Sequence, residues 1–293
     1  MRGEREMLTI NQTNDYLNRL GIERQLPTKD FLFDLHRAHV EKIAWQTIDI
    51  FAGKPVSIDF KDSTNHIINN GGGYCFHLNG AFSLLLRSLG YNVSLHRAGV
   101  QSHGHVPRID SYHLGLSVSI TNENLRAQTW LVDVGLGDMP YEPIPLVLGE
   151  YKQDFHTYKI TKSSVAASGW RLEHDPQGAF IGVDIDPEDV KDIEEFIPKH
   201  EQLSSAPDST WVDLLLVRNR HKTGSNELKG CVFSQRSEIG ITKSEVTNRT
   251  SWFEILKEVF GEPLNHFSEL EKDELWSKAL KAHEEWKRNQ PDH

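Results

Sequence analysis

The feature that most constrains the fold is a run of three glycines, Gly71–Gly73, which ends two residues before Cys75. Apolar residues then recur at three- and four-residue spacing, at Leu78, Phe82, Leu85, Leu86 and Leu89, so the pattern predicts a helix that begins at Cys75 and ends near Gly90. The first backbone N–H groups of a helix have no intrahelical acceptor and favour negative charge. A thiol at this position is therefore suited to act as a nucleophilic thiolate. A buried structural cysteine is the alternative, and Cys75 alone does not decide between them.

Two strand patterns follow, and each carries a polar residue suited to catalysis. Residues 113–120 alternate apolar with small or polar side chains, which predicts a strand beginning near His113. Residues 130–137 form a second apolar strand, which Asp133 interrupts and glycines close. A buried carboxylate needs a partner, and an imidazole is a good one. Singly, His113 fits a core histidine and Asp133 a strand-end turn, but the order cysteine, histidine, aspartate is that of a catalytic triad.

Composition indicates a soluble enzyme and argues against several other classes. The 293 residues include 42 acidic and 32 basic side chains, a net charge of −10, which is unfavourable for binding a phosphate backbone. Cys75 and Cys231 are the two cysteines, which fits a reducing compartment. The start of the chain lacks the apolar region of a leader peptide, and no apolar run reaches membrane-spanning length. We expect a cytoplasmic protein that binds neither nucleic acid nor membrane.

The order of helical and strand patterns predicts an α+β fold. Residues 10–92 are mainly helical, with Thr28 as one N-cap, and residues 93–184 form short β segments that suggest a barrel or sandwich. Asp186 and Pro187 are expected to begin an acidic helix within a connection at 185–210. Strands at 211–218 and 231–236 and two helices with capping boxes, at Ser251 and at Ser268, follow.

Three motifs, in order, resemble those of the arylamine N-acetyltransferases. The segment Gly72–Phe76 with Asn79 is similar to the family's Arg-Gly-Gly-Tyr/Trp-Cys-Phe-Glu-x-Asn, His113–Leu116 to its histidine strand, and Val132–Gly137 to its Val-Asp-Val-Gly-Phe-Gly. Residues 16–20, 35–39 and 43–49 resemble its opening segments, and the likeness is strong to about residue 147. The resemblance implies a cysteine-protease-like core in three parts: a helical bundle with the nucleophile (1–92), a β-barrel with the histidine and aspartate (93–200), and an α/β lid with C-terminal helices (201–293).

The chain departs from the family pattern at several positions. Gly71 replaces the motif arginine, His77 replaces the glutamate after Cys-Phe, and Ala44–Thr47 replaces a Pro-Phe-Glu-Asn turn. In the family that arginine pairs with the turn's glutamate, whose place Gln46 takes here, so both partners of one ion pair are missing together. Loss of both partners of a buried ion pair can leave the stability of a protein nearly unchanged. We therefore expect a divergent but competent member whose acceptor pocket is altered at Trp45.

The resemblance implies a ping-pong acetyl transfer from acetyl-CoA through Cys75, with His113 as base and Asp133 as orienting acid. The loop at 101–112 and the lid would receive coenzyme A, which singles out Gly104, Arg108, Tyr112, Arg220 and Lys222. A solvated loop and a hairpin tip are the alternatives for these positions. Trp45 and Tyr74 are expected to contact the acceptor. The spacing of His96, His103, His105 and His113 lacks a zinc-site pattern, so no metal is predicted.

The triad alone leaves three functions open. An acetyl-CoA-dependent transferase would use an arylamine, hydrazine or arylhydroxylamine acceptor. A Cys-His-Asp thiol hydrolase or transglutaminase-like enzyme has the same residues in the same order. An amide synthase that takes a carrier-bound acyl chain is the third.

Overall fold

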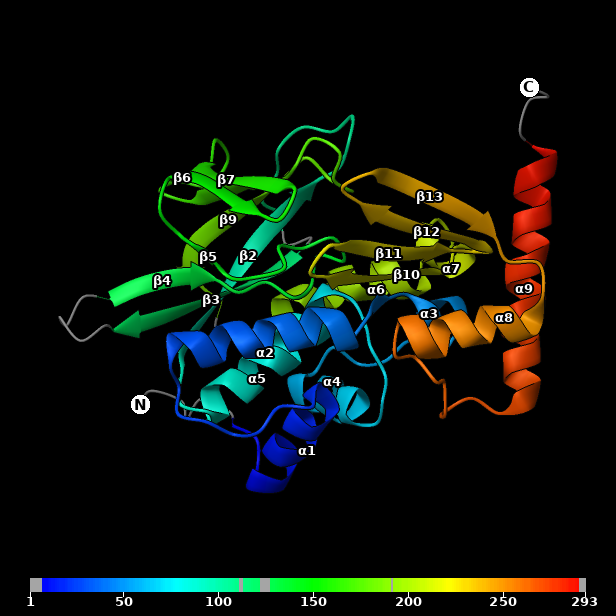
Figure 1. Ribbon diagram of the computed structural model, residues 1–293, viewed down its shortest axis with the longest axis horizontal. Helices are drawn as coiled ribbons and strands as arrows, with labels where there is room; N and C mark the ends of the chain where they lie inside the picture. Colours follow the sequence, from blue (N-terminus) through cyan, green and yellow to red (C-terminus); the bar gives the residue numbers. More distant parts are fainter. Residues whose placement is uncertain (1–6, 111–112, 122–126, 191, 290–293) are drawn as a thin grey trace.

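The computed structural model describes residues 7–110, 113–121, 127–190 and 192–289. In these ranges a group of N-terminal helices lies below two antiparallel sheets, one of eight strands and one of five (Figure 1). This arrangement confirms the predicted α+β class. The helices of the N-terminal layer are α1 (Ile10–Leu20), α2 (Lys29–Lys42), α3 (Ile48–Phe51), α4 (Phe60–Ile68) and α5 (Cys75–Ser88).

Local signals set the ends of these helices. Thr9 and Gln12 form a capping box at the start of α1, and the Thr28 side chain accepts a hydrogen bond from the Phe31 N–H at the start of α2, as predicted. Helix α5 begins at Cys75, and the chain leaves it through Gly90, which has φ 98°. Residues on every side of α5 are buried, because α4 and strands β2 and β3 pack around it.

The eight-stranded sheet forms a nearly closed barrel (Figure 1). Its order is β5-β4-β3-β2-β9-β8-β7-β6, so the strand that begins with His113 lies between β2 and β4. The strands are β2 (Asn92–Gln101), β3 (His113–Thr121), β4 (Ala127–Leu131), β5 (Ile144–Pro145), β6 (Gly149–Gln153), β7 (His156–Lys162), β8 (Trp170–Glu173) and β9 (Gly182–Asp189).

The acidic helix expected at Asp186 and Pro187 is wrong, because both residues belong to β9. The register between β2 and β9 shifts between His96 and Ala98, so residues 186–188 form a bulge opposite Arg97. Proline is tolerated in a bulge because the bulged residue does not have to donate an N–H to the neighbouring strand. Helical structure begins later, with η1 (Ile193–Phe196) and α6 (Ile197–Ser205).

The five-stranded sheet includes a strand from the N-terminal layer. Its order is β1-β10-β11-β12-β13, where β1 (Trp45–Gln46) pairs with β10. The other strands are β10 (Leu216–His221), β11 (Gly224–Lys229), β12 (Val232–Ser237) and β13 (Gly240–Glu245). The strand expected at 211–218 is therefore shorter, since α7 (Thr210–Asp213) precedes it with Ser209 as N-cap.

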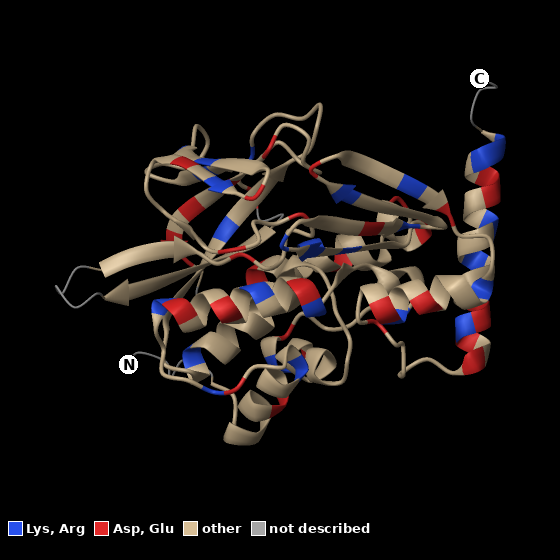
Figure 2. Ribbon diagram, viewed as in Figure 1, with Lys and Arg blue, Asp and Glu red and all other residues tan. Residues whose placement is uncertain are grey.

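Two helices follow the second sheet. Helix α8 (Arg249–Glu254) is capped by Asn248, so the capping box expected at Ser251 is wrong. A π-helical segment, η2 (Ile255–Val259), continues it. Helix α9 (Glu269–Arg288) has the predicted Ser268–Glu271 capping box, and acidic and basic residues alternate along it (Figure 2). None of the helices in the described ranges combines the length and apolar character that crossing a bilayer requires.

Candidate active site

The glycine turn before α5 exists because the backbone there passes close to other atoms. A methyl group added at Gly72 would lie 2.5 Å from the carbonyl oxygen of Ala44, and one added at Gly73 would lie 2.7 Å from Cβ of His77. Any larger residue would displace the turn. The turn delivers Cys75 as the first residue of α5, where the backbone N–H groups of the first turn lack intrahelical acceptors.

The three residues predicted as a triad lie together. Nε2 of His113 is 2.6 Å from Oδ2 of Asp133, and the same imidazole hydrogen-bonds to the Cys75 thiol. All three side chains are buried. Burial lowers the pKa of His113, but the charges of Asp133 and Cys75 outweigh it and raise that pKa to about 10. Burial raises the pKa of Asp133, yet the His113 imidazolium and hydrogen bonds hold it below its usual range. This arrangement favours a protonated His113 imidazole beside the Cys75 sulfur.

Asn79, one turn after the nucleophile, fixes α5 to strand β3 and to the turn that follows β4. Its side-chain amide donates to the Leu114 carbonyl at 2.6 Å and to Asp133 Oδ1 at 2.7 Å, and its oxygen accepts from the Val134 N–H at 3.0 Å. Since Asn79 is fully buried, its carbonyl and both amide protons are used inside the protein. The sequence motif included this asparagine without indicating its role.

Asp133 lies beyond the strand that was expected to contain it. Strand β4 ends at Leu131, and Asp133 begins a turn in which its Oδ1 accepts the Gly135 N–H at 2.9 Å. This local bond makes the strand end where it does. A methyl group added at Gly135 would lie 2.7 Å from Cα of Cys75. The turn and the start of α5 therefore touch.

Aromatic side chains surround Tyr74, the residue before the nucleophile. The Trp211 ring meets Tyr74 edge-on at 4.9 Å and Trp45 edge-on at 5.5 Å between centroids. The Tyr74 hydroxyl hydrogen-bonds to His200 of α6. Trp45 and Tyr74, the expected acceptor contacts, are thus joined by Trp211 of α7. The sequence interpretation missed Trp211 because it assigned that residue to a strand.

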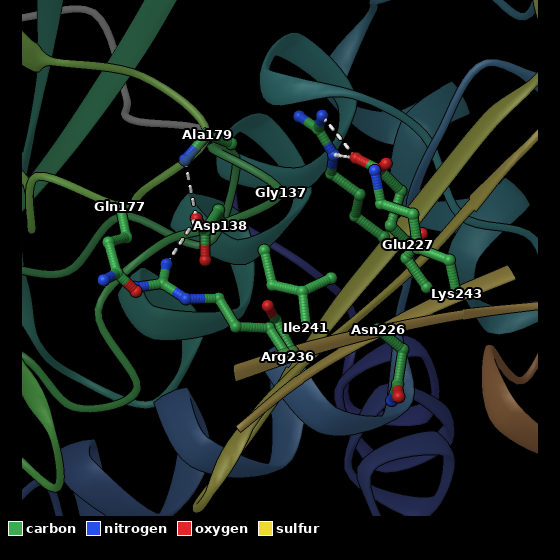
Figure 3. A pocket seen from close by; sticks show the side chains of 12 residues that line it. Gly137, Asp138, Gln177, Ala179, Asn226, Glu227, Arg236, Ile241 and Lys243 are labelled. Carbon is green, nitrogen blue, oxygen red and sulfur yellow. Dashed lines mark hydrogen bonds and ion pairs between the residues drawn. The ribbon is translucent and has the colours of Figure 1, made fainter. Parts of the chain in front are cut away.

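A pocket of about 200 Å³ opens between the catalytic turn and the second sheet (Figure 3). Gly137 and Asp138 line one side, and Arg218, Arg236 and Lys243 of the second sheet line the other. Asp138 accepts the Ala179 N–H and lies 3.7 Å from Nη1 of Arg236.

Two arginines of this pocket, Arg218 and Arg236, pair with different carboxylates. Arg218 is neutralised by Glu227, with Nε and Oε2 2.7 Å apart. Arg236 pairs with Asp175 at 3.0 Å through Nη2, while its buried Nε and Nη1 have no hydrogen-bond partner among the described residues. Asp138 and Asp175 therefore both flank the Arg236 guanidinium.

The residues predicted to contact coenzyme A are not gathered in one place. Gly104 is exposed at φ 80°, and Arg108 donates from Nε to the Val100 carbonyl at 3.0 Å. Tyr112 lies outside the described residues. Arg220 is fully buried, and its guanidinium donates to the carbonyls of residues 139, 221 and 224. Lys222 is exposed in the turn between β10 and β11.

The departures from the family motif are close to one another. Gln46 N–H donates to the Gly73 carbonyl at 2.8 Å, and a methyl at Gly72 would lie 3.1 Å from Cγ of Gln46. Gln46 therefore lies against Gly72 and Gly73 of the glycine turn, and the joint loss of one ion pair at Gln46 and Gly71 stays a prediction. His77 is buried, with Nε2 3.1 Å from the Val56 carbonyl oxygen.

The chain resembles known proteins over most of its length. The N-acetyltransferase family model matches residues 28–268. The chain belongs to the arylamine N-acetyltransferase family. It is an enzyme of the acyltransferase class. It is 26% identical over 231 residues to the arylamine N-acetyltransferase pineal gland isozyme NAT-3 of Gallus gallus, covering 72% of this chain and 77% of that protein. A Salmonella typhimurium arylamine N-acetyltransferase / N-hydroxyarylamine O-acetyltransferase is 34% identical over 116 residues, which cover 38% of each chain.

Solved structures share the fold. The arylamine N-acetyltransferase of Mycobacterium marinum superposes with a TM-score of 0.80 at 23% identity, covering 92% of this chain and 99% of that one. A structure of the same enzyme in complex with CoA gives a TM-score of 0.79 at 22% identity, with the same coverage.

Proposed function

We propose that this family member transfers an acetyl group from acetyl-CoA to the nitrogen of an arylamine, hydrazine or arylhydroxylamine through an acyl-cysteine. The observation that carries the proposal is the contact of Cys75, His113 and Asp133 at the start of a helix. The family membership supports acetyl transfer, and the triad supplies a covalent route for it.

In the first half-reaction the Cys75 thiolate attacks the thioester carbonyl carbon. The oxygen becomes negative, and backbone N–H groups at the start of α5 would stabilise it. The carbon–sulfur bond to coenzyme A then breaks, and the His113 imidazolium gives its proton to the departing thiolate. Acetyl-Cys75 and neutral His113 remain, with Asp133 orienting the ring.

In the second half-reaction an amine attacks the acetyl carbon. Neutral His113 takes the amine proton, the bond to the Cys75 sulfur breaks, and the amide leaves with the thiolate–imidazolium pair restored. Burial of the triad limits the access of water to the acyl-enzyme. The aromatic cluster of Trp45, Tyr74 and Trp211 is our proposed wall for the acceptor ring.

We place the coenzyme A phosphates at the pocket beside Gly137 rather than at Arg220, because the Arg220 guanidinium is committed to backbone carbonyls. Arg236 and the exposed Lys243 supply positive charge there. We expect Arg236→Gln to raise the KM for acetyl-CoA about tenfold, as loss of a charge-assisted contact would. Turnover of p-nitrophenyl acetate, which has no phosphate, should not change. Arg249→Gln, an exposed position on α8, is the control.

Mass spectrometry tests the covalent route. Incubation with acetyl-CoA and no acceptor should add one acetyl group at Cys75, and Cys75→Ala should add none. A screen with a small aniline, a hydrazine and a hydroxylated arylamine should then show turnover in the wild type alone. Turnover retained by Cys75→Ala would exclude the covalent route. Absence of acetylation would favour the hydrolase alternative, and acylation from a carrier protein alone would favour the amide synthase.

A further inference from the structure

Three side chains from distant parts of the sequence converge where α3, α4 and the turn before α9 meet. Nε2 of His266 lies 3.0 Å from Oδ1 of Asp49, and Nε2 of His66 lies 3.4 Å from Oδ2 of the same carboxylate. The three ligand-type atoms lie within 4.8 Å of one another. The two imidazoles meet edge-on, with centroids 5.3 Å apart.

This cluster has an unsatisfied polar atom. Nε2 of His66 is buried without a hydrogen-bond partner in the described ranges, so the Asp49 carboxylate 3.4 Å away does not satisfy it. The His66 imidazole therefore offers a buried ligand-type atom beside a carboxylate.

We propose that Asp49, His66 and His266 bind a divalent transition-metal ion, for which Zn²⁺ is the best match. Zinc binds imidazole nitrogen and carboxylate oxygen at about 2.0–2.2 Å, so tetrahedral ligand atoms lie about 3.3–3.6 Å apart. Nε2 of His266 lies 3.0 Å from Oδ1 of Asp49 and Nε2 of His66 lies 3.4 Å from Oδ2, so both nitrogens are near that distance from the same carboxylate. Two nitrogens and one carboxylate favour zinc and its neighbours over Mg²⁺ or Ca²⁺, which prefer oxygen ligands.

The surroundings allow both entry and retention of an ion. The His266 side chain is 36% exposed, whereas those of His66 and Asp49 are 14% and 10% exposed. An ion could therefore arrive from the His266 side and keep a water as fourth ligand. The amide of Gln46 donates to Asp49 Oδ2 at 2.9 Å and would orient the carboxylate.

A second cluster in the described residues is less suited to an ion. Glu245 accepts from both His283 and Lys287 at 3.0 Å, and with Glu284 it lies exposed on the protein surface. Its charge is already neutralised by Lys287. Only the Asp49 cluster combines burial with a donor atom that has no partner in the described ranges.

A bound ion would act by positioning, since the triad is complete without it. The His66 carbonyl accepts the Gly71 N–H at 3.0 Å, and a methyl at Gly71 would lie 2.2 Å from the His66 ring. Metal ligation would hold that ring against the glycine turn that delivers Cys75. It would also attach the segment before α9 to the helical layer.

Titration of untagged, chelator-treated protein with Zn²⁺ or Co²⁺ tests the site. We expect one ion per chain by calorimetry, a higher Tm with Zn²⁺, and a Co²⁺ visible spectrum without a thiolate charge-transfer band, which excludes binding at Cys75. His266→Gln and His66→Gln should each weaken binding at least about tenfold, because loss of even an outer-shell partner has that effect. His105→Gln, at an exposed loop position, should bind as the wild type does.

None of these measurements depends on acetyl transfer, so the metal site and the catalytic proposal can fail separately. Circular dichroism establishes that His266→Gln, a half-exposed position, is folded before it is titrated. Anomalous diffraction at the zinc edge from soaked wild-type crystals provides a second measurement that needs no variant. Absence of one-to-one binding, unchanged affinity in both histidine variants, or an ion located elsewhere would overturn the proposal.

Discussion

Asn79→Ala is expected to destabilise the protein and to disable its nucleophile together. The change removes a hydrogen bond to the ionised Asp133, which contributes about 1.5–3 kcal/mol. It also leaves the Val134 N–H buried without its acceptor, at a cost of about 1–3 kcal/mol. The Leu114 carbonyl, which points to the side of β3 where Leu116 accepts the Val132 N–H and not toward β2, also loses its donor. The free energy of unfolding should therefore fall by about 2.5–6 kcal/mol, a large share of the roughly 5–15 kcal/mol typical of folded proteins.

Urea unfolding of wild type and variant measures the stability, and the rate of iodoacetamide alkylation of Cys75 measures thiolate formation. Because Asn79 aligns Asp133 with both α5 and β3, alkylation near neutral pH should slow at least about tenfold in the folded variant. Ser83→Ala is the matched control, since Ser83 is also buried on α5 and its hydroxyl donates to the Gly80 carbonyl of its own helix. A stability loss below about 1 kcal/mol, with normal alkylation, would show that Asn79 does not hold the site together.

Three other substitutions test separate parts of the structure. Asp133→Asn removes the larger of the two charges that raise the pKa of His113, so burial should lower that pKa from its wild-type value of about 10. In the wild type the His113–Asp133 ion pair stabilises the protein at neutral pH, and this stability is lost as pH rises toward about 10. The variant should lack this stability at neutral pH. Urea unfolding at a series of pH values measures the difference. Gly135→Ala places a methyl 2.7 Å from Cα of Cys75. This overlap should lower the free energy of unfolding by about 1–3 kcal/mol and prevent acetylation of Cys75, which mass spectrometry would detect. Full acetylation would contradict the contact. Ser268→Ala should lower stability by about 1 kcal/mol in thermal unfolding, and an unchanged Tm would argue against the cap.

The proximity of Cys75, His113 and Asp133 could be predicted because its determinants are local. Glycines before Cys75, apolar periodicity after it and alternation from His113 each fix one element, and the elements bring their polar residues together. Chain order, spacing and the family resemblance predicted the contacts from Cys75 to His113, 38 positions apart, and from His113 to Asp133, 20 positions apart. The catalytic roles of the three residues stay a prediction.

The errors arose where tertiary contacts override local preference. Asp186 and Pro187 have the pattern of a helix start, yet the register of β2 places them in a bulge of β9. Arg220 is part of a basic run at a hairpin, yet its side chain turns inward to the carbonyl of residue 139 and to those of residues 221 and 224 in its own hairpin, so its predicted contact with coenzyme A stays untested. The cluster of Asp49, His66 and His266 has no sequence spacing that could reveal it, because His266 is 200 residues away from His66.

Strand β1 makes the second sheet dependent on residues synthesised long before it. Trp45 pairs with Arg218 and also bridges to Gly73, so the two-residue strand connects the nucleophile turn to the sheet that borders the pocket. A fragment that begins after residue 200 would have β10 as a bare edge, exposing backbone groups that invite pairing with another chain. During synthesis Gln46 can pair with Val217 of β10 only after β10 has been made. Residues after 200 are therefore not expected to fold as an independent domain. Cleavage or circular permutation between residues 46 and 71 would disturb both the nucleophile turn and the five-stranded sheet.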